Sequence, residues 1–108
     1  MSKPVNFDRD ARAELDAAIG WYDDEREGLG DELLGDVLET ALLVGEAPDA
    51  RPEARDAGPL PAGAPVVREA LLRRFPYRLV YFELAELVIV LAVAHKRQRP
   101  GYWRGRLG

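Results

Sequence analysis

The sequence has no cysteine, a single histidine, and only one serine and one threonine. The lack of cysteine excludes disulfides, thiolate metal sites and a cysteine nucleophile. His95 alone cannot build a multi-histidine metal site, and Ser2 and Thr40 leave almost no hydroxyl for a catalytic triad. We therefore expect neither a metal ion nor a cofactor.

Long apolar runs are also missing. The longest covers residues 87–94, whereas a membrane-spanning helix needs roughly 18 apolar residues. The first residues lead straight into charged sequence without an apolar signal region. With 108 residues, 47% of them hydrophobic and 31% charged, the chain is expected to be one domain over residues 1–108. We expect a cytoplasmic protein that makes no membrane contact.

Charge is distributed unevenly along the chain. Residues 1–64 hold 16 acidic against 6 basic side chains, and residues 65–108 hold 9 basic against 3 acidic ones. Two interpretations are open. The basic half forms a local anion-binding surface, or acidic helices and a basic sheet neutralise each other within the fold.

Two segments carry apolar residues at helical spacing. The first covers residues 9–26, and its stripe consists of Ala11, Leu15, Ala18, Ile19 and Tyr22. Gly28 and Gly30 interrupt the pattern, and a second helix is expected from about residue 31 to 44. This second segment is apolar around much of its circumference, which favours contact with both the first helix and a sheet.

The remaining segments predict one loop and four strands. Residues 45–65 hold five of the eight prolines and no apolar period, so we expect a mobile, extended loop that adds only scattered charges and tolerates replacement by a short link. Residues 66–72, 77–84 and 87–94 predict an antiparallel meander, and residues 4–7 a short edge strand. The expected fold class is α+β, in the order β-α-α-β-β-β, with both faces of strand 87–94 covered.

Basic residues are the candidates for function. Arg78 lies in an otherwise apolar strand, so it must reach solvent, a ligand, or a carboxylate such as Glu69 or Glu83. Residues 95–106 interleave cations with rings, which suits phosphate contact and base stacking. Alternatively, Tyr102 and Trp103 fold back over the open sheet face. The candidate target- or anion-binding residues are Arg68, Arg73, Arg74, Arg78, Arg97, Arg99, Trp103 and Arg104.

The order of these motifs resembles the RelE/ParE toxin family. The helical half matches in Trp21-Tyr22, in residues 26–30 and in Leu33-Leu34, and the sheet half in residues 73–81, 90–95 and 97–103. The resemblance implies the toxin of a type II toxin–antitoxin module of the plasmid-stabilisation kind, held inactive by a small antitoxin. We expect that antitoxin to lie across the helical hairpin and the sheet edge, partly neutralising the basic half.

The family implies two different targets. RelE-like members cut messenger RNA on the ribosome, and ParE-like members inhibit DNA gyrase. If the chain is a nuclease, the resemblance implies catalytic roles for Arg78, His95, Arg97 and Tyr102. However, the strand over residues 68–72 carries Glu69 where the nuclease has lysines, which favours gyrase binding. The alternatives are the ribosome-dependent endoribonuclease and a non-catalytic RNA- or protein-binding module of the same fold.

Overall fold

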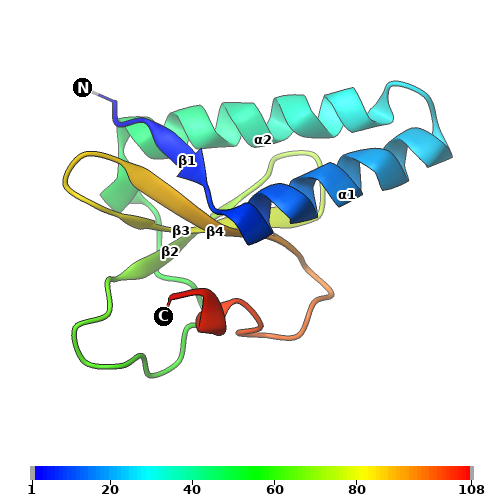
Figure 1. The fold of residues 1–108 in the computed structure, drawn as a ribbon. Coiled ribbons are helices and arrows are strands. Elements are labelled where there is room, and N and C mark those ends of the chain that lie inside the picture. Colours follow the sequence, from blue (N-terminus) through cyan, green and yellow to red (C-terminus); the bar gives the residue numbers. More distant parts are fainter. Residues whose placement is uncertain (1, 108) are drawn as a thin grey trace.

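Two long helices lie side by side across one face of a sheet (Figure 1). The structure is a computed structural model that describes residues 2–107. Helix α1 spans Arg9–Glu25 and helix α2 spans Leu29–Glu46. Both predicted helices are confirmed, with small shifts at their ends.

The turn between the helices depends on two glycines. Gly28 has a φ of +89°, in the left-handed region that favours glycine. Gly30, in the first turn of α2, lies so close to α1 that its amide donates to the Asp23 carboxylate over 2.8 Å. A Cβ at this position would lie 2.6 Å from the carbonyl oxygen of Ile19. Only glycine therefore allows this approach of the two helices.

The sheet contains four strands in the order β1-β4-β3-β2. They are β1 (Val5–Phe7), β2 (Val67–Leu71), β3 (Tyr77–Glu83) and β4 (Val88–His95). Strands β2, β3 and β4 form the predicted antiparallel meander, and β1 adds to the edge beside β4 in parallel. The α+β class and the β-α-α-β-β-β order are confirmed.

The register of β3 and β4 decides which side chains share a face. Tyr77 lies opposite His95, and Arg78 lies opposite Ala94. Leu79 and Tyr81 of β3 are buried against the helices, whereas Val80 is buried on the opposite face. Arg78, which lies between Tyr77 and Leu79 along the strand, shares that opposite face.

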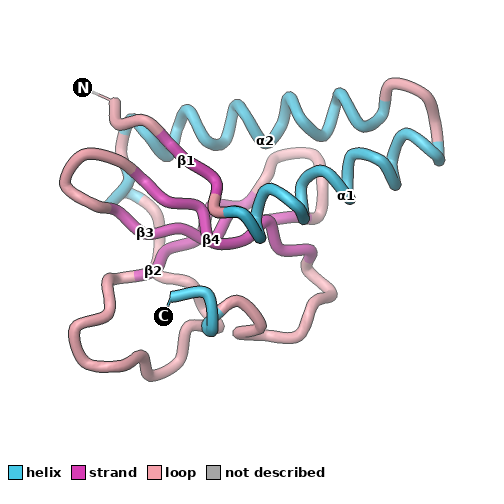
Figure 2. Tube along the Cα trace, in the orientation of Figure 1, coloured by secondary structure: helices cyan, strands magenta, loops and turns pink. Residues whose placement is uncertain are grey.

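Loop segments and the C-terminal residues cover the face opposite the helices (Figure 2). Trp103 is fully buried there, together with Ala54 of the long loop and Leu91 and Ala92 of β4. Both faces of β4 are therefore covered, as its uninterrupted apolar sequence predicts.

The expectation that residues 45–65 contribute only scattered charges is wrong. The Ala54 amide donates to the Val67 carbonyl over 2.9 Å, and the Glu69 amide donates to the Pro52 carbonyl over 3.0 Å. The Tyr81 hydroxyl donates to the carbonyl of Pro48 over 2.6 Å. The first two of these bonds pair the otherwise free edge of β2, whose backbone groups need partners, and the third ties the loop to a side chain of β3. The segment is also not extended throughout, because residues 45 and 46 end α2 and Pro48–Ala50 form a short 3-10 helix. A short link in its place would lose these contacts.

Helix α2 keeps part of its apolar surface exposed. Leu33, Val37 and Val44 are buried in the core between α1 and the sheet, whereas Leu42 is 68% exposed and Leu38 50% exposed. The predicted contact of this helix with both the first helix and the sheet is thus confirmed for its inner side. Neither helix within residues 2–107 combines the length and apolar character that a bilayer span requires.

Two of the three glycines of α2, Gly30 and Gly35, provide a matched test of the hairpin. We expect Gly30→Ala to lower the free energy of unfolding by about 1–3 kcal/mol, because the added methyl meets backbone of α1. Gly35 is exposed and has open space around it, so Gly35→Ala should raise stability by about 0.5–1 kcal/mol. Urea unfolding of both variants measures the difference, and equal effects would contradict the close approach at Gly30.

Candidate functional site

The guanidinium of Arg78 is held between two carboxylates. Its Nη1 and Nη2 donate to Oδ1 and Oδ2 of Asp56 over 2.9 and 2.6 Å, and Nη1 also donates to Oε1 of Glu69 over 3.1 Å. The Arg78 side chain is only 14% exposed. Glu69 is one of the two carboxylates foreseen from the sequence, whereas Glu83 instead pairs with Lys3. The strand arginine is thus satisfied within the protein.

Asp56 joins three parts of the chain. Besides Arg78, its Oδ2 accepts hydrogen bonds from the Gly101 amide at 2.7 Å and the Trp103 indole at 3.1 Å. Its backbone carbonyl accepts from the Arg104 guanidinium at 2.9 Å. Sequence reasoning missed this residue because it lies in a loop without periodicity. Only an indirect argument points to such a residue, because an arginine in an apolar strand and a buried tryptophan each need a hydrogen-bond acceptor.

This network fixes the charge of Asp56. Burial acts to raise the pKa of Asp56, but hydrogen bonds from Arg78, Gly101 and Trp103 outweigh it and lower the pKa to about 2. Burial acts to lower the pKa of Arg78, but the bond to Asp56 and the charges of Asp56 and Glu69 raise it. Both groups are therefore ionised at neutral pH, and the cation has its counter-ions in place.

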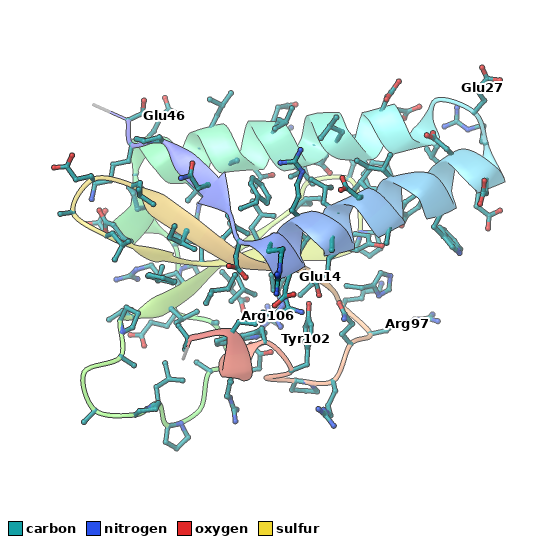
Figure 3. All side chains as sticks on the ribbon, viewed as in Figure 1. Glu14, Glu27, Glu46, Arg97, Tyr102 and Arg106 are labelled. Carbon is teal, nitrogen blue, oxygen red and sulfur yellow. The ribbon has the colours of Figure 1, made fainter. Side chains whose placement is uncertain are left out.

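A second carboxylate, Glu14 of α1, fastens the C-terminal residues (Figure 3). Tyr102 donates its hydroxyl to Glu14 Oε2 over 2.6 Å, and Arg106 donates to both oxygens over 2.9 and 3.0 Å. The Val93 amide of β4 donates to the same carboxylate over 3.0 Å. Burial and the bond to Glu14 raise the pKa of Tyr102. Tyr102 is therefore a neutral hydrogen-bond donor in this structure.

The alternative in which the C-terminal rings cover the sheet is confirmed for Trp103, which is fully buried. The arginines beside it are not simply solvated. Arg104 bonds to a backbone carbonyl, and the Arg106 side chain, 18% exposed, bonds to Glu14 and to the Leu91 carbonyl. These side chains hold the C-terminal segment in place.

His95 lies apart from Arg78. Its ring packs edge-on against Tyr77, with ring centres 5.0 Å apart, on the sheet face that carries the helices. Its Nδ1 accepts the Arg97 amide over 3.1 Å. Burial and the charges of Arg97 and Lys96 lower the pKa of His95, so the ring is neutral at pH 7. The predicted base and the predicted anion-stabilising arginine are thus on opposite faces of the sheet.

The other candidate cations fall into two groups. Arg68 donates to the Arg51 carbonyl over 2.7 Å, and Arg74 pairs with Glu32 over 2.6 Å. Three exposed candidates form no ion pair with the described part of the chain: Arg73, Arg97 and Arg99. Arg97 points away from the body of the molecule (Figure 3).

Part of the charge of the two halves is therefore neutralised inside the fold. Carboxylates of the acidic half pair with Arg74, Arg78 and Arg106 of the basic half. Of the candidates without an ion pair, Arg97 and Arg99 lie in the turn after β4, and Arg73 lies in the β2–β3 connection. No group of three or more carboxylate or imidazole side chains within residues 2–107 is arranged to hold a metal ion. The arrangement offers a binding surface, but it does not bring a base, an acid and a free cation together.

The fold is that of a small α+β domain, and the comparisons identify its family. Residues 5–100 match the family described as the ParE toxin of the type II toxin–antitoxin system parDE. Because this match spans most of the chain, the protein belongs to the ParE toxin family and is the toxin component of a type II toxin–antitoxin module.

Two solved structures share the fold. The chromosomal ParDE toxin–antitoxin system from P. aeruginosa superposes with a TM-score of 0.68 at 18% identity, over 87% of this chain and 96% of that one. A free-state mutant of the E. coli toxin RelE superposes with a TM-score of 0.53 at 24% identity, over 96% of this chain and 94% of that one. Comparison with curated proteins gives no significant match.

The Asp56 network generates a stability prediction. Asp56→Asn removes one of the two carboxylates that neutralise Arg78, whose side chain is only 14% exposed, so the free energy of unfolding should fall by about 3 kcal/mol. Asp49→Asn is the matched control, because Asp49 is exposed in the same loop and should change stability by less than about 0.5 kcal/mol. Urea unfolding at pH 7 measures both.

The same variant tests the pKa of Asp56. A carboxyl whose pKa falls from 3.8 to about 2 on folding stabilises the native state above pH 4, and this stabilisation is lost as the pH drops toward 2. The wild type should therefore lose about 2 kcal/mol more than Asp56→Asn between pH 5 and pH 2. Parallel pH dependences of the two proteins would show that Asp56 has an ordinary pKa.

Proposed function

We propose that this toxin arrests growth by binding and inhibiting DNA gyrase, and that it does not cleave RNA. The observation that carries the proposal is the double carboxylate clamp on Arg78, the arginine that the RelE-like resemblance assigns to the scissile phosphate. The proposal implies action in the cytoplasm, where the chromosome and its gyrase are found.

The free energies involved favour the ion pairs of Arg78 with Asp56 and Glu69 over a contact of Arg78 with phosphate. Removing one partner from a buried ion pair costs about 3–5 kcal/mol, because the other charge is left uncompensated. One contact that stabilises developing charge in a transition state contributes roughly 2.7–4 kcal/mol. Moving Arg78 from Asp56 and Glu69 to a phosphate would therefore gain little or nothing.

Proton transfer lacks a suitable group near Arg78. Cleavage of a phosphodiester by its 2′-hydroxyl needs a general base as well as charge stabilisation. The neighbouring strand β2 contributes Glu69, which already accepts bonds from Arg55 and Arg78. His95 faces the helices and the Tyr102 hydroxyl is engaged with Glu14. A toxin that acts by binding needs none of these proton movements.

The endoribonuclease remains the second candidate, because the free-state RelE mutant shares the fold. A supercoiling assay with purified gyrase and a cell-free reporter translation assay separate the two candidates. We expect the wild-type toxin to inhibit supercoiling and to leave messenger RNA intact. Cleaved messenger RNA together with unimpaired supercoiling would refute the proposal.

The variant His95→Gln further separates the nuclease from the gyrase inhibitor. It removes the one candidate for proton transfer near neutral pH, so it should abolish growth arrest by a nuclease and change that of a gyrase inhibitor less than about twofold. Expression must be matched by soluble protein level. Truncation after Pro100 is unsuitable here, because it deletes buried Trp103 and with it part of the core.

The antitoxin is the second partner, since the chain belongs to a toxin–antitoxin family. We propose that it covers the exposed leucines of α2 and the adjoining groove of about 490 Å³ beside β1, which Val5, Phe7, Leu38 and Leu42 help to line.

Leu42→Arg should then weaken the toxin–antitoxin complex about tenfold in calorimetry, whereas Leu84→Arg in the β3–β4 turn should not. Added salt should weaken the electrostatic contribution to toxin–antitoxin affinity. An affinity that does not change with salt would exclude such a contribution.

A further inference from the structure

An open pocket of about 510 Å³ lies where β3 begins and β4 ends. We call it the end pocket. Its walls come from three regions: the β2–β3 connection, the loop at Arg55 and Asp56, and the turn after β4.

Apolar side chains line much of the end pocket. Leu71 is the last residue of β2 and lies opposite Arg78 in the sheet, yet it is 58% exposed. Phe75 and Pro76 of the β2–β3 connection and Pro100 of the segment after β4 line the same pocket. An exposed leucine in a concave site lined by prolines is typical of a site where a partner protein buries an apolar side chain.

The accessible charge of the end pocket is positive. Its acidic residue Asp56 is 5% exposed and is neutralised by Arg78, and nearby Glu69 is 4% exposed and bonded to Arg55. Lys96 lines the pocket, is exposed, and forms no ion pair with any described residue. Arg97 and Arg99 follow in the same exposed turn. The pocket therefore combines a neutral floor with a cationic rim.

We propose that the end pocket is the docking site for the toxin's target, and that its occupant is an acidic protein segment with one apolar side chain as an anchor. The inference rests on the proposed function, under which this segment belongs to gyrase. The anchor side chain packs between Leu71, Phe75 and Pro100. Carboxylates beside the anchor meet Lys96, Arg97 and Arg99, and steer the encounter.

The charge of the floor distinguishes this occupant from nucleic acid. A phosphate that entered the pocket would need the guanidinium of Arg78, which Asp56 and Glu69 already neutralise. It would also approach two buried carboxylates. An uncharged anchor meets neither obstacle, because it contacts apolar wall and leaves the ion-pair network intact.

Two single substitutions test the site. Leu71→Asp places a charge where the anchor packs, and Lys96→Glu reverses a rim charge on a solvent-exposed turn. Each should raise the toxin concentration for half-inhibition of gyrase supercoiling at least about tenfold. Leu84→Asp is the control for the first substitution, since Leu84 is 46% exposed in the β3–β4 turn at the other end of the sheet. Arg12→Glu on α1, where the side chain is 70% exposed, is the control for the second.

Each result of these assays supports or overturns a different part of the proposal. Inhibition lost in both pocket variants but retained in both controls, with unchanged antitoxin binding and thermal midpoints, supports the proposal. Full inhibition by Leu71→Asp and Lys96→Glu overturns the pocket while gyrase remains the target. A wild-type toxin without effect on supercoiling overturns the proposed function and the gyrase segment with it. Binding of an RNA oligonucleotide that both pocket variants abolish overturns the protein occupant.

Discussion

The carboxylate of Asp56 is the contact on which the rest of this structure depends. It accepts hydrogen bonds from a strand arginine, a backbone amide and a tryptophan indole, which come from residues 78, 101 and 103. A guanidinium on an otherwise apolar sheet face is tolerable only when it is neutralised. Once Asp56 supplies that charge, its remaining acceptor capacity holds the C-terminal segment over the sheet, and Trp103 is buried there. The long loop, the sheet and the C-terminal residues are therefore one network.

This network also determines which charges are available to a partner. Three basic side chains of the second half of the chain, Arg74, Arg78 and Arg106, have carboxylate partners from the first half. Of the others, Lys96, Arg97 and Arg99 lie in the exposed turn that follows β4, Arg73 is exposed in the β2–β3 connection, and Arg68 and Arg104 donate to backbone carbonyls. A sequence with a strongly basic C-terminal portion thus gives a neutral sheet face bordered by a basic rim. Such a surface favours protein recognition, since phosphate binding would need cations in the floor as well as at the rim.

Periodic patterns made the regular elements predictable from the sequence. The stripe from Ala11 to Tyr22 gives α1, the uninterrupted apolar run gives β4 with both faces covered, and short connections give the meander. The sequence also required an acceptor for Arg78, but only the register shows that Glu69 supplies one and Glu83 does not. Asp56 and Glu14 escaped prediction because each acts through partners far away in sequence. A carboxylate in a loop or on a helix surface has no local pattern that reports such a partner.

The separation of His95 from Arg78 follows from one irregularity in the sheet. Tyr81 pairs with Val90 but Val80 pairs with Ala92, so β4 holds one extra residue, Leu91, at that point. Side chains alternate along a strand, and one inserted residue therefore reverses the faces of everything beyond it. Without the insertion, His95 would share the face of Arg78; with it, His95 packs on Tyr77 beneath the helices. The bulge thus puts a general base out of reach of the arginine, and the same sheet is left suited to binding.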